Sequence, residues 1–254
     1  MTPSPILEAK GVCKSFDGFA AVKNARVRVE KGRVTAVIGP NGAGKTTLFD
    51  LITGMSAPDS GEIRLKGRNI AGLAPHRVCR AGIGRSFQVP RLFPRLTVFE
   101  NVQIAVLARL KKTWTLFSPA RRMAREETAD ILEKTGLSDK AKKTGAELSH
   151  GDHKVLEMAM ALGSAPELLI FDEPTAGMSS EETARAMTLI RRMSEEMGLA
   201  VLFCEHDIDL VFSMAHEIMA MAGGETIAQG TPGEIRKNSR VQSAYLGGEA
   251  FAGS

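Results

Sequence analysis

The chain contains few cysteines, and their spacing suits neither a disulfide framework nor a zinc site. Cys13, Cys79 and Cys204 are the three cysteines in 254 residues, and no two of them form a C-x-x-C pair. Small disulfide-stapled domains usually carry an even number of cysteines, and zinc sites carry them in closely spaced pairs. The scarcity therefore speaks against both classes and favours a reducing compartment such as the cytosol.

Long apolar runs are also missing. No stretch reaches the roughly eighteen consecutive apolar residues that indicate a membrane-spanning helix. The first residues, MTPSPILEAKG, lack the basic segment and the long apolar run of a secretory signal. We therefore expect a chain that does not span a membrane by itself.

The charge balance shows no large excess of one sign. A formal net charge of +4 suits a protein that handles phosphates or lies beneath a membrane, but it falls short of the dense basic stripe of a nucleic-acid-binding protein. We accordingly expect no nucleic-acid partner. At 254 residues the chain is long enough for a proper core in one large domain or two small ones.

What the sequence does contain is a candidate phosphate-binding loop. The stretch GPNGAGKTT, residues 39–47, fits the pattern G-x-x-x-x-G-K-[ST]. It lies between RVTAVI, an apolar run typical of a buried strand, and LFDLITG, in which the apolar spacing is helical. A phosphate cradle requires this succession of strand, loop and helix. The competing interpretation, a glycine-rich turn with a surface lysine, explains the pattern but not its context.

The residue types of this loop match the needs of bound phosphate. Glycines let successive backbone N–H groups converge on the β- and γ-phosphates, and the start of the helix adds its dipole. Lys45 supplies a positive charge, Thr46 is placed to give its hydroxyl to Mg²⁺, and Thr47 reaches the α-phosphate. The candidate nucleotide-binding residues of the loop are Gly39, Asn41, Gly42, Ala43, Gly44, Lys45, Thr46 and Thr47.

Apolar periodicity divides the rest of the chain into three kinds of segment. Alternation around residues 6–12, 26–30 and 63–65 predicts half-exposed antiparallel strands. From about residue 96 to 162 the spacing is helical. Short apolar runs return at 168–171 and 200–204 and predict buried strands joined by a helix. The expected fold class is therefore α/β, with an antiparallel side sheet and a mostly helical insertion.

A pair of carboxylates follows the first of these buried strands. In ELLIFDEP, Asp172 and Glu173 come directly after the apolar run, and open α/β sheets bind their ligands at this end of a strand. Asp172 is suited to hold Mg²⁺ through its water shell, and Glu173 is suited to orient or deprotonate the water that attacks the γ-phosphate. Acidic residues often merely end a strand, so the pair gains its weight from following a phosphate loop.

Five motifs in a fixed order resemble one family. They are GPNGAGKTT, Gln88 within RSFQ, ELSHGDHKVLEMAMAL, IFDEP and His206 within CEHD. Together they resemble the ATP-binding cassette ATPases of ABC transporters over nearly the whole chain, which implies a P-loop NTPase core with an antiparallel β side sheet and an α-helical insertion subdomain. The implied division is a single ATP-binding domain at residues 4–247, with a core of about 4–88 and 163–240, a helical subdomain of about 89–162, and a tail at 248–254.

The resemblance implies ATP and Mg²⁺ as ligands and adds three residues to the site. Phe16 matches the aromatic residue that stacks on adenine, Gln88 matches the residue that senses Mg²⁺ and the γ-phosphate, and His206 matches the switch histidine. Taken singly, Phe16 would be interpreted as a core residue, Gln88 as a surface residue and His206 as a loop residue. The implied catalytic residues are Glu173, His206 and Gln88, and the implied metal-binding residues are Thr46, Gln88 and Asp172.

The resemblance also implies that two such domains pair head to tail. Ser149 and Gly151 of LSHGD then contact the γ-phosphate held by the other chain. His150 and Asp152 stand where the commonest form of this motif has glycine and glutamine, and Ser179 of AGMSS stands where many relatives have aspartate. We assign Ser179 no catalytic role. Ser149 and Asp152 also fit an S-x-x-D capping box for the following helix.

Two further stretches point to a subfamily. GRSFQVPRLFPRLTVFENV and GETIAQGTPGEIRKNSRVQSAYLGG resemble the ATP-binding subunits of bacterial importers for branched-chain, hydrophobic amino acids. This implies three partners: integral-membrane permease subunits docked around residues 88–100, a homologous ATPase subunit in a homodimer or heterodimer, and indirectly a periplasmic solute-binding protein. The implied location is the cytoplasmic face of the inner membrane, as a peripheral subunit.

Other functions stay open. A urea or short-chain amide importer subunit uses nearly the same motifs, and a lipopolysaccharide-export ATPase is a more distant alternative. Cassette ATPases without a transport role form a different class. Their chromosome-type members insert a long coiled coil, whereas Gln88 and Leu148 are only 60 residues apart, and their ribosome-type members usually carry two cassettes. Members of the iron–sulfur assembly type have a similar length. A GTPase is disfavoured because no N-K-x-D motif follows.

Overall fold

A mixed sheet carries the predicted motifs at the ends of its strands. The computed structural model of the protein describes residues 5–86, 92–110 and 120–245. The strand order is β10-β9-β3-β8-β7-β6, in which β10 runs antiparallel to β9 and the other neighbours are parallel. The strands are β3 (Val34–Ile38), β6 (Ile83–Arg85), β7 (Leu168–Asp172), β8 (Ala200–Cys204), β9 (Glu217–Ala222) and β10 (Glu225–Gly230). Strands β3, β7 and β8 are buried throughout because both faces of this sheet are covered, which explains their continuous apolar runs.

An antiparallel sheet in the order β2-β1-β4-β5 lies over one face of the mixed sheet. Its strands are β1 (Leu7–Phe16), β2 (Phe19–Val29), β4 (Ser60–Leu65) and β5 (Arg68–Asn69). Helix α1 (Lys45–Thr53) packs between the two sheets, where Leu48 joins Val12 and Val37 in one hydrophobic core. The alternating burial along β1 and β2 reflects this single covered face.

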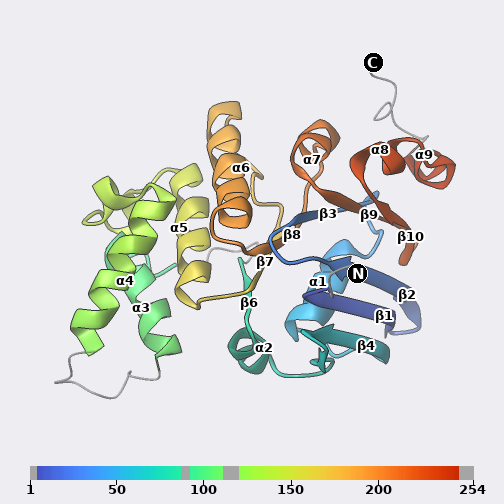
Figure 1. Cartoon of the computed structure of the whole chain (residues 1–254), viewed down its shortest axis with the longest axis horizontal. Helices are drawn as coiled ribbons and strands as arrows, with labels where there is room; N and C mark the ends of the chain where they lie inside the picture. The colour runs from blue at the N-terminus through green and yellow to red at the C-terminus, as the bar shows by residue number, and fades with distance from the viewer. Residues whose placement is uncertain (1–4, 87–91, 111–119, 246–254) are drawn as a thin grey trace.

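Helices cover the opposite face of the mixed sheet and form a second core. Figure 1 shows α3, α4 and α5 grouped at one end of the molecule, far from the antiparallel sheet. The remaining helices are α2 (Pro75–Ala81), α3 (Val98–Arg109), α4 (Ala120–Thr135), α5 (His150–Gly163), α6 (Ser180–Glu195), α7 (Ile208–Met214), α8 (Pro232–Arg236) and α9 (Ser239–Tyr245), with short 3₁₀ turns at Ser138–Lys140 and Gly145–Glu147.

The predicted α/β class is confirmed, including the antiparallel side sheet and the helical insertion. The helical spacing from about residue 96 to 162 corresponds to α3, α4 and α5. Within the ranges that the structure describes, no helix combines the length and the apolar character needed to cross a bilayer.

Candidate nucleotide-binding site

The glycine-rich loop connects the end of β3 to the start of α1. Lys45 is buried, and its Nζ donates to the carbonyl oxygens of Gly39 at 2.6 Å and Pro40 at 3.2 Å. Carbonyl dipoles satisfy its hydrogen bonds without cancelling its charge, so the loop favours a bound anion. Of the other predicted loop residues, Ala43 is buried, Gly44 and Thr47 are half-buried, and Asn41, Gly42 and Thr46 are exposed.

Helix α1 begins without a side-chain cap. Gly44 is its N-cap residue, in the left-handed region with φ at 96°, and the first turn, which the structure describes in full, contains no acidic residue. Most helices satisfy these first N–H groups with a side-chain oxygen. Here the N–H groups and the positive end of the helix dipole are left for an anionic ligand. A side chain at Gly39 would collide with the carbonyl oxygen of Met221, so the loop has no room for one.

Asp172, the last residue of β7, is buried and held from two sides. The thiol of Cys204 on β8 donates to Oδ1 at 2.9 Å, and Nη2 of Arg85 lies 3.4 Å from Oδ2. Burial and then the charge of Asp172 raise the pKa of the Cys204 thiol, which keeps its proton and serves as the donor. Arg85 also pairs with Asp50 of α1 at 2.5 Å, so one guanidinium ties the loop's helix to the end of β7.

Glu173 and His206 meet beyond the ends of β7 and β8. Oε1 of Glu173 lies 2.8 Å from Nε2 of His206, and their side chains are 29% and 55% exposed. Glu173 has a φ of 52°, a left-handed conformation that non-glycine residues rarely adopt and that is found at functional sites. The two predicted catalytic residues are therefore brought together, with the carboxylate reachable from solvent.

The residue that positions this pair was not among the predicted site residues. Glu205 is buried, and its Oε1 accepts hydrogen bonds from the backbone N–H and the hydroxyl of Thr175 at 2.8 and 2.7 Å. It thereby joins the loop after Glu173 to the loop that carries His206. A carboxylate directly before a candidate histidine was the available signal, but its partner 30 residues away is set by the fold.

Tyr245 is a second residue that sequence reasoning missed. It ends α9, and the backbone N–H of Gly39 hydrogen-bonds its phenolic oxygen, while burial raises the pKa of the phenol. The C-terminal helix therefore contacts the first residue of the phosphate loop.

The donors around the loop fit Mg²⁺ bound together with phosphate. Thr46 presents a hydroxyl at the start of α1, and Asp172 presents a carboxylate at the end of β7; both are the hard oxygen ligands that Mg²⁺ prefers. No group of three or more His, Cys, Asp or Glu suited to a metal occurs among the described residues.

The predicted signature residues lie at the start of α5, against a carboxylate of α6. Ser149 is the N-cap residue, and its Oγ donates to Oε1 of Glu182 at 3.4 Å. Bonds from Ser179, then from the Gly151 backbone and the Ser149 side chain, outweigh desolvation and lower the pKa of Glu182. A side chain at Gly151 would collide with this carboxylate. An acidic group thus occupies the helix start at which a phosphate is expected.

The two unusual residues of LSHGD each have a partner. The backbone N–H of Asp152 donates to Ser149 Oγ at 3.1 Å, as a capping box requires, but the Asp152 carboxylate accepts from Lys140 at 2.6 Å. Burial acts to raise the pKa of Asp152, yet the hydrogen bond and charge of Lys140 outweigh it and leave the pKa lowered. His150 Nε2 lies 3.0 Å from the carbonyl oxygen of Ala176 in the AGMSS loop.

Phe16 lies at the turn between β1 and β2. Its side chain is exposed, and Nζ of Lys14 lies 5.4 Å from the centre of its ring. The same hairpin reaches the loop, because a side chain at Gly44 would come within 2.6 Å of the Ala21 carbonyl oxygen. The exposed ring of Phe16 is therefore available for stacking on a nucleotide base. Gln88, the other predicted contact, lies outside the described residues.

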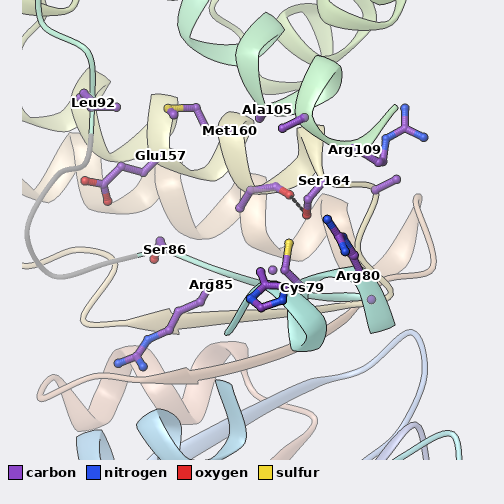
Figure 2. Close-up of a pocket in the computed structure, with 16 residues that line it drawn as sticks. Cys79, Arg80, Arg85, Ser86, Leu92, Ala105, Arg109, Glu157, Met160 and Ser164 are labelled. Carbon is purple, nitrogen blue, oxygen red and sulfur yellow. Dashed lines mark hydrogen bonds between the residues drawn. The ribbon is translucent and has the colours of Figure 1, made fainter. Parts of the chain in front are cut away.

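A cavity of about 830 Å³ lies between the sheet and the helical group. Figure 2 shows its lining residues, which come from α2 and β6 on the sheet side and from α3 and α5 on the other side. Leu92, at the edge of the segment predicted to meet a membrane subunit, lies on its wall together with Met160 and Ala105. The cavity is separate from the phosphate loop but shares Arg85 with the network around Asp172.

Comparisons with known proteins agree with the five motifs. Residues 22–176 match the family described as ABC transporter, and residues 225–250 match the family described as branched-chain amino acid ATP-binding cassette transporter.

The chain is 40% identical over 96% of its length to the high-affinity branched-chain amino acid transport ATP-binding protein BraF of Pseudomonas aeruginosa, covering 98% of that protein. It is 38% identical over 96% of its length to LivG of Salmonella typhimurium, a protein of the same description, again covering 98%. It is 32% identical over 96% of its length to the lipopolysaccharide export system ATP-binding protein LptB of Acidithiobacillus ferridurans, with 98% of that protein covered.

Solved structures show the same architecture. The ADP conformation of MJ1267, an ATP-binding cassette of an ABC transporter, superposes with a TM-score of 0.85 at 29% identity, covering 97% of this chain and 100% of that one. The dimeric bacterial cassette MJ0796 superposes with a TM-score of 0.76 at 25% identity, covering 89% and 98%.

Proposed function

The chain belongs to the ABC transporter family of ATP-binding cassettes, and we propose that it is the ATP-hydrolysing subunit that powers an importer for branched-chain, hydrophobic amino acids. The ATPase assignment is carried by the pairing of Glu173 with His206 at 2.8 Å, beyond strands that flank a phosphate loop. The amino-acid assignment is supported by the C-terminal family match and by the relatives described as branched-chain amino acid transport proteins.

ATP binding follows from the loop. Lys45 exchanges the carbonyl oxygens of Gly39 and Pro40 for phosphate oxygens, and the uncapped start of α1 holds the phosphates with its N–H groups. Phe16 stacks on the adenine. Mg²⁺, when bound, neutralises phosphate charge during the transfer. Thr46 and Asp172, with Gln88, are the residues that would hold it.

Hydrolysis uses the pair beyond β7 and β8. Glu173 orients a water molecule for attack on the γ-phosphate and accepts its proton. His206 holds the carboxylate in place through their hydrogen bond and contacts the γ-phosphate. Glu205 fixes the distance between the two loops by its bonds to Thr175. The buried thiol of Cys204 and the guanidinium of Arg85 hold the Asp172 carboxylate in place.

The complete site requires a second chain. In the dimer, Ser149 and Gly151 meet the γ-phosphate held by the partner chain. Because the carboxylate of Glu182 contacts both residues in the single chain, closure requires this contact to break or to make room. The partner chain is a second copy or a homologous ATPase subunit.

The remaining partners are assigned by the same proposal. Permease subunits in the inner membrane dock at the cavity between α2 and α5, and a periplasmic solute-binding protein supplies the solute. The chain itself lies at the cytoplasmic face as a peripheral subunit. The ATP-binding domain spans residues 4–247, with α3, α4 and α5 in the helical subdomain at about residues 89–162.

Uptake by a strain that lacks the gene tests this function. The wild-type gene and the control variant Glu133→Gln, exposed on α4, should restore uptake of labelled leucine, and Glu173→Gln should not. Restored uptake of urea or acetamide in place of leucine would favour the amide importer. Co-purification with a soluble scaffold in place of a multi-pass membrane protein would favour a cassette ATPase without a transport role.

A further inference from the structure

The cavity between the sheet and the helical group has different charges at its two ends. Small or apolar side chains line much of its wall, including Leu92, Ala105, Ala108, Met160 and Ala161. Figure 2 shows Glu157 near Leu92 at one end and Arg80 at the other. Two further arginines line the cavity, but each already pairs with a carboxylate, Arg109 with Glu127 and Arg85 with Asp50. An occupant with a cation at the first end and a negative end at the second would match this arrangement.

Glu157 is the unusual group in this lining. Its side chain projects from α5, the residue is only 7% exposed, and Oε1 is buried without a hydrogen-bond partner among the described residues. Burying a carboxylate without a partner is costly, and proteins rarely keep one unless it is used. Burial raises its pKa to about 7, although the positive charges of Lys154 and His150 on the same helix act to lower it.

A bound cation would compensate the energetic cost of burying the Glu157 carboxylate. A lysine or arginine side chain entering the cavity would supply the hydrogen bonds that Oε1 lacks, and in a largely apolar pocket such a charge-assisted bond is strong. The apolar middle of the cavity would cover the aliphatic part of that side chain and its neighbours. A cavity of about 830 Å³ has room for several side chains of a docked segment.

We propose that Glu157 pairs with a lysine or arginine of the membrane subunit, on a short amphipathic segment that docks in this cavity with its acidic or carboxyl-terminal end toward Arg80. The pairing fixes both the direction and the identity of the docked segment, because a segment with the reverse charge order would place like charges together at each end. This inference rests on the proposed docking of a permease subunit.

The test uses the chain together with the membrane subunits encoded beside its gene, solubilised in detergent. Glu157→Gln keeps the shape of the side chain and removes its charge, and we expect it to weaken binding to the membrane subunits about tenfold or more, since charge-assisted pairs are stronger than neutral ones. Glu133→Gln, which removes an exposed carboxylate from α4, should bind like the wild type. If Glu157→Gln fails to fold, as judged by thermal unfolding, Glu157→Met takes its place.

Alanine substitutions at each basic residue in the cytoplasmic segments of the membrane subunits then identify the partner. One of them should weaken binding to the wild-type chain and cause no further loss with Glu157→Gln. Wild-type affinity in Glu157→Gln, or purely additive losses at every basic residue, would overturn the pairing.

Docking itself has a separate readout in Cys79, which is exposed and lines the same cavity. In a Cys13→Ser background, with Cys204 buried, a maleimide should label Cys79 in the free chain and not in the complex. Labelling that persists in the complex would overturn docking in the cavity. Protection of Cys79 with unchanged affinity of Glu157→Gln would leave docking standing and reject only the charge pair.

Discussion

Replacement of the buried carboxylate of Glu157 should change how stability depends on pH. Burial raises the pKa of this group from its ordinary 4.5 to about 7 in the folded chain. The unfolded chain therefore releases the proton at a lower pH than the folded chain does. The free energy of unfolding falls as the pH rises from about 4.5, and this loss is complete above about 7.

The size of the effect follows from the gap between the two pKa values. At about 1.36 kcal/mol for each pKa unit, a pKa raised from 4.5 to about 7 corresponds to a total loss of about 3 kcal/mol. Of this, about 2.5 kcal/mol falls between about pH 5 and about pH 8. Glu157→Gln has no charge to bury, so its stability relative to the wild type should rise by that amount over this interval.

Urea unfolding of the nucleotide-free chain at several pH values measures this difference. The charged and ionisable side chains near Glu157 remain in both proteins and largely cancel in the comparison. They are His150 and Lys154 on α5, and His76, Arg80, Arg85 and Arg109 around the cavity. Any hydrogen bond that the glutamine amide leaves unmade shifts the difference equally at every pH. Glu133→Gln, at an exposed position, should show little pH dependence relative to the wild type. A difference between Glu157→Gln and the wild type that stays constant with pH would refute a carboxylate held near neutrality by burial.

Three further predictions concern the nucleotide site. Lys45→Ala should abolish ATP hydrolysis and leave the circular dichroism spectrum unchanged, because the lysine serves bound phosphate and lies where a loop meets α1; near-normal turnover would end the phosphate-loop assignment. Glu173→Gln should bind ATP normally but hydrolyse it at least about a hundredfold more slowly, so that an ATP-bound dimer accumulates on gel filtration, with the sister subunit added if needed. No such dimer would count against Glu173 as the base. Glu182→Gln should lower the ATP concentration at which dimers form, since the incoming phosphate no longer meets a carboxylate at Ser149 and Gly151. An unchanged or higher ATP requirement would mean that Glu182 serves mainly as the cap of α6.

The sequence by itself determined the elements and the main chemical groups of the site. A strand, a glycine-rich loop and a helix in immediate succession can be predicted around residues 39–47, because local chain geometry and the spacing of neighbouring apolar residues decide them. Asp172 and Glu173 follow a short apolar run that indicates a buried strand, so their place at a sheet edge was also predictable. The order of motifs indicated that Glu173 and His206 both serve the γ-phosphate, but not that their side chains lie 2.8 Å apart.

The tertiary structure decided the contacts between segments far apart in the chain. Arg85 joins Asp50 to Asp172, and Glu205 bonds to Thr175, because parallel strands bring their ends together whatever their separation in sequence. The capping box predicted at Ser149 and Asp152 is only half formed, since Lys140 is folded close enough to take the carboxylate.

Glu157 shows the limit of sequence reasoning most clearly. Its place in an amphipathic helix gives no sign that it faces a cavity, and its desolvation exists only once α3 and β6 pack against α5. A pKa depends on the atoms that replace water around the group, and those atoms are supplied by packing between elements, which local sequence does not specify.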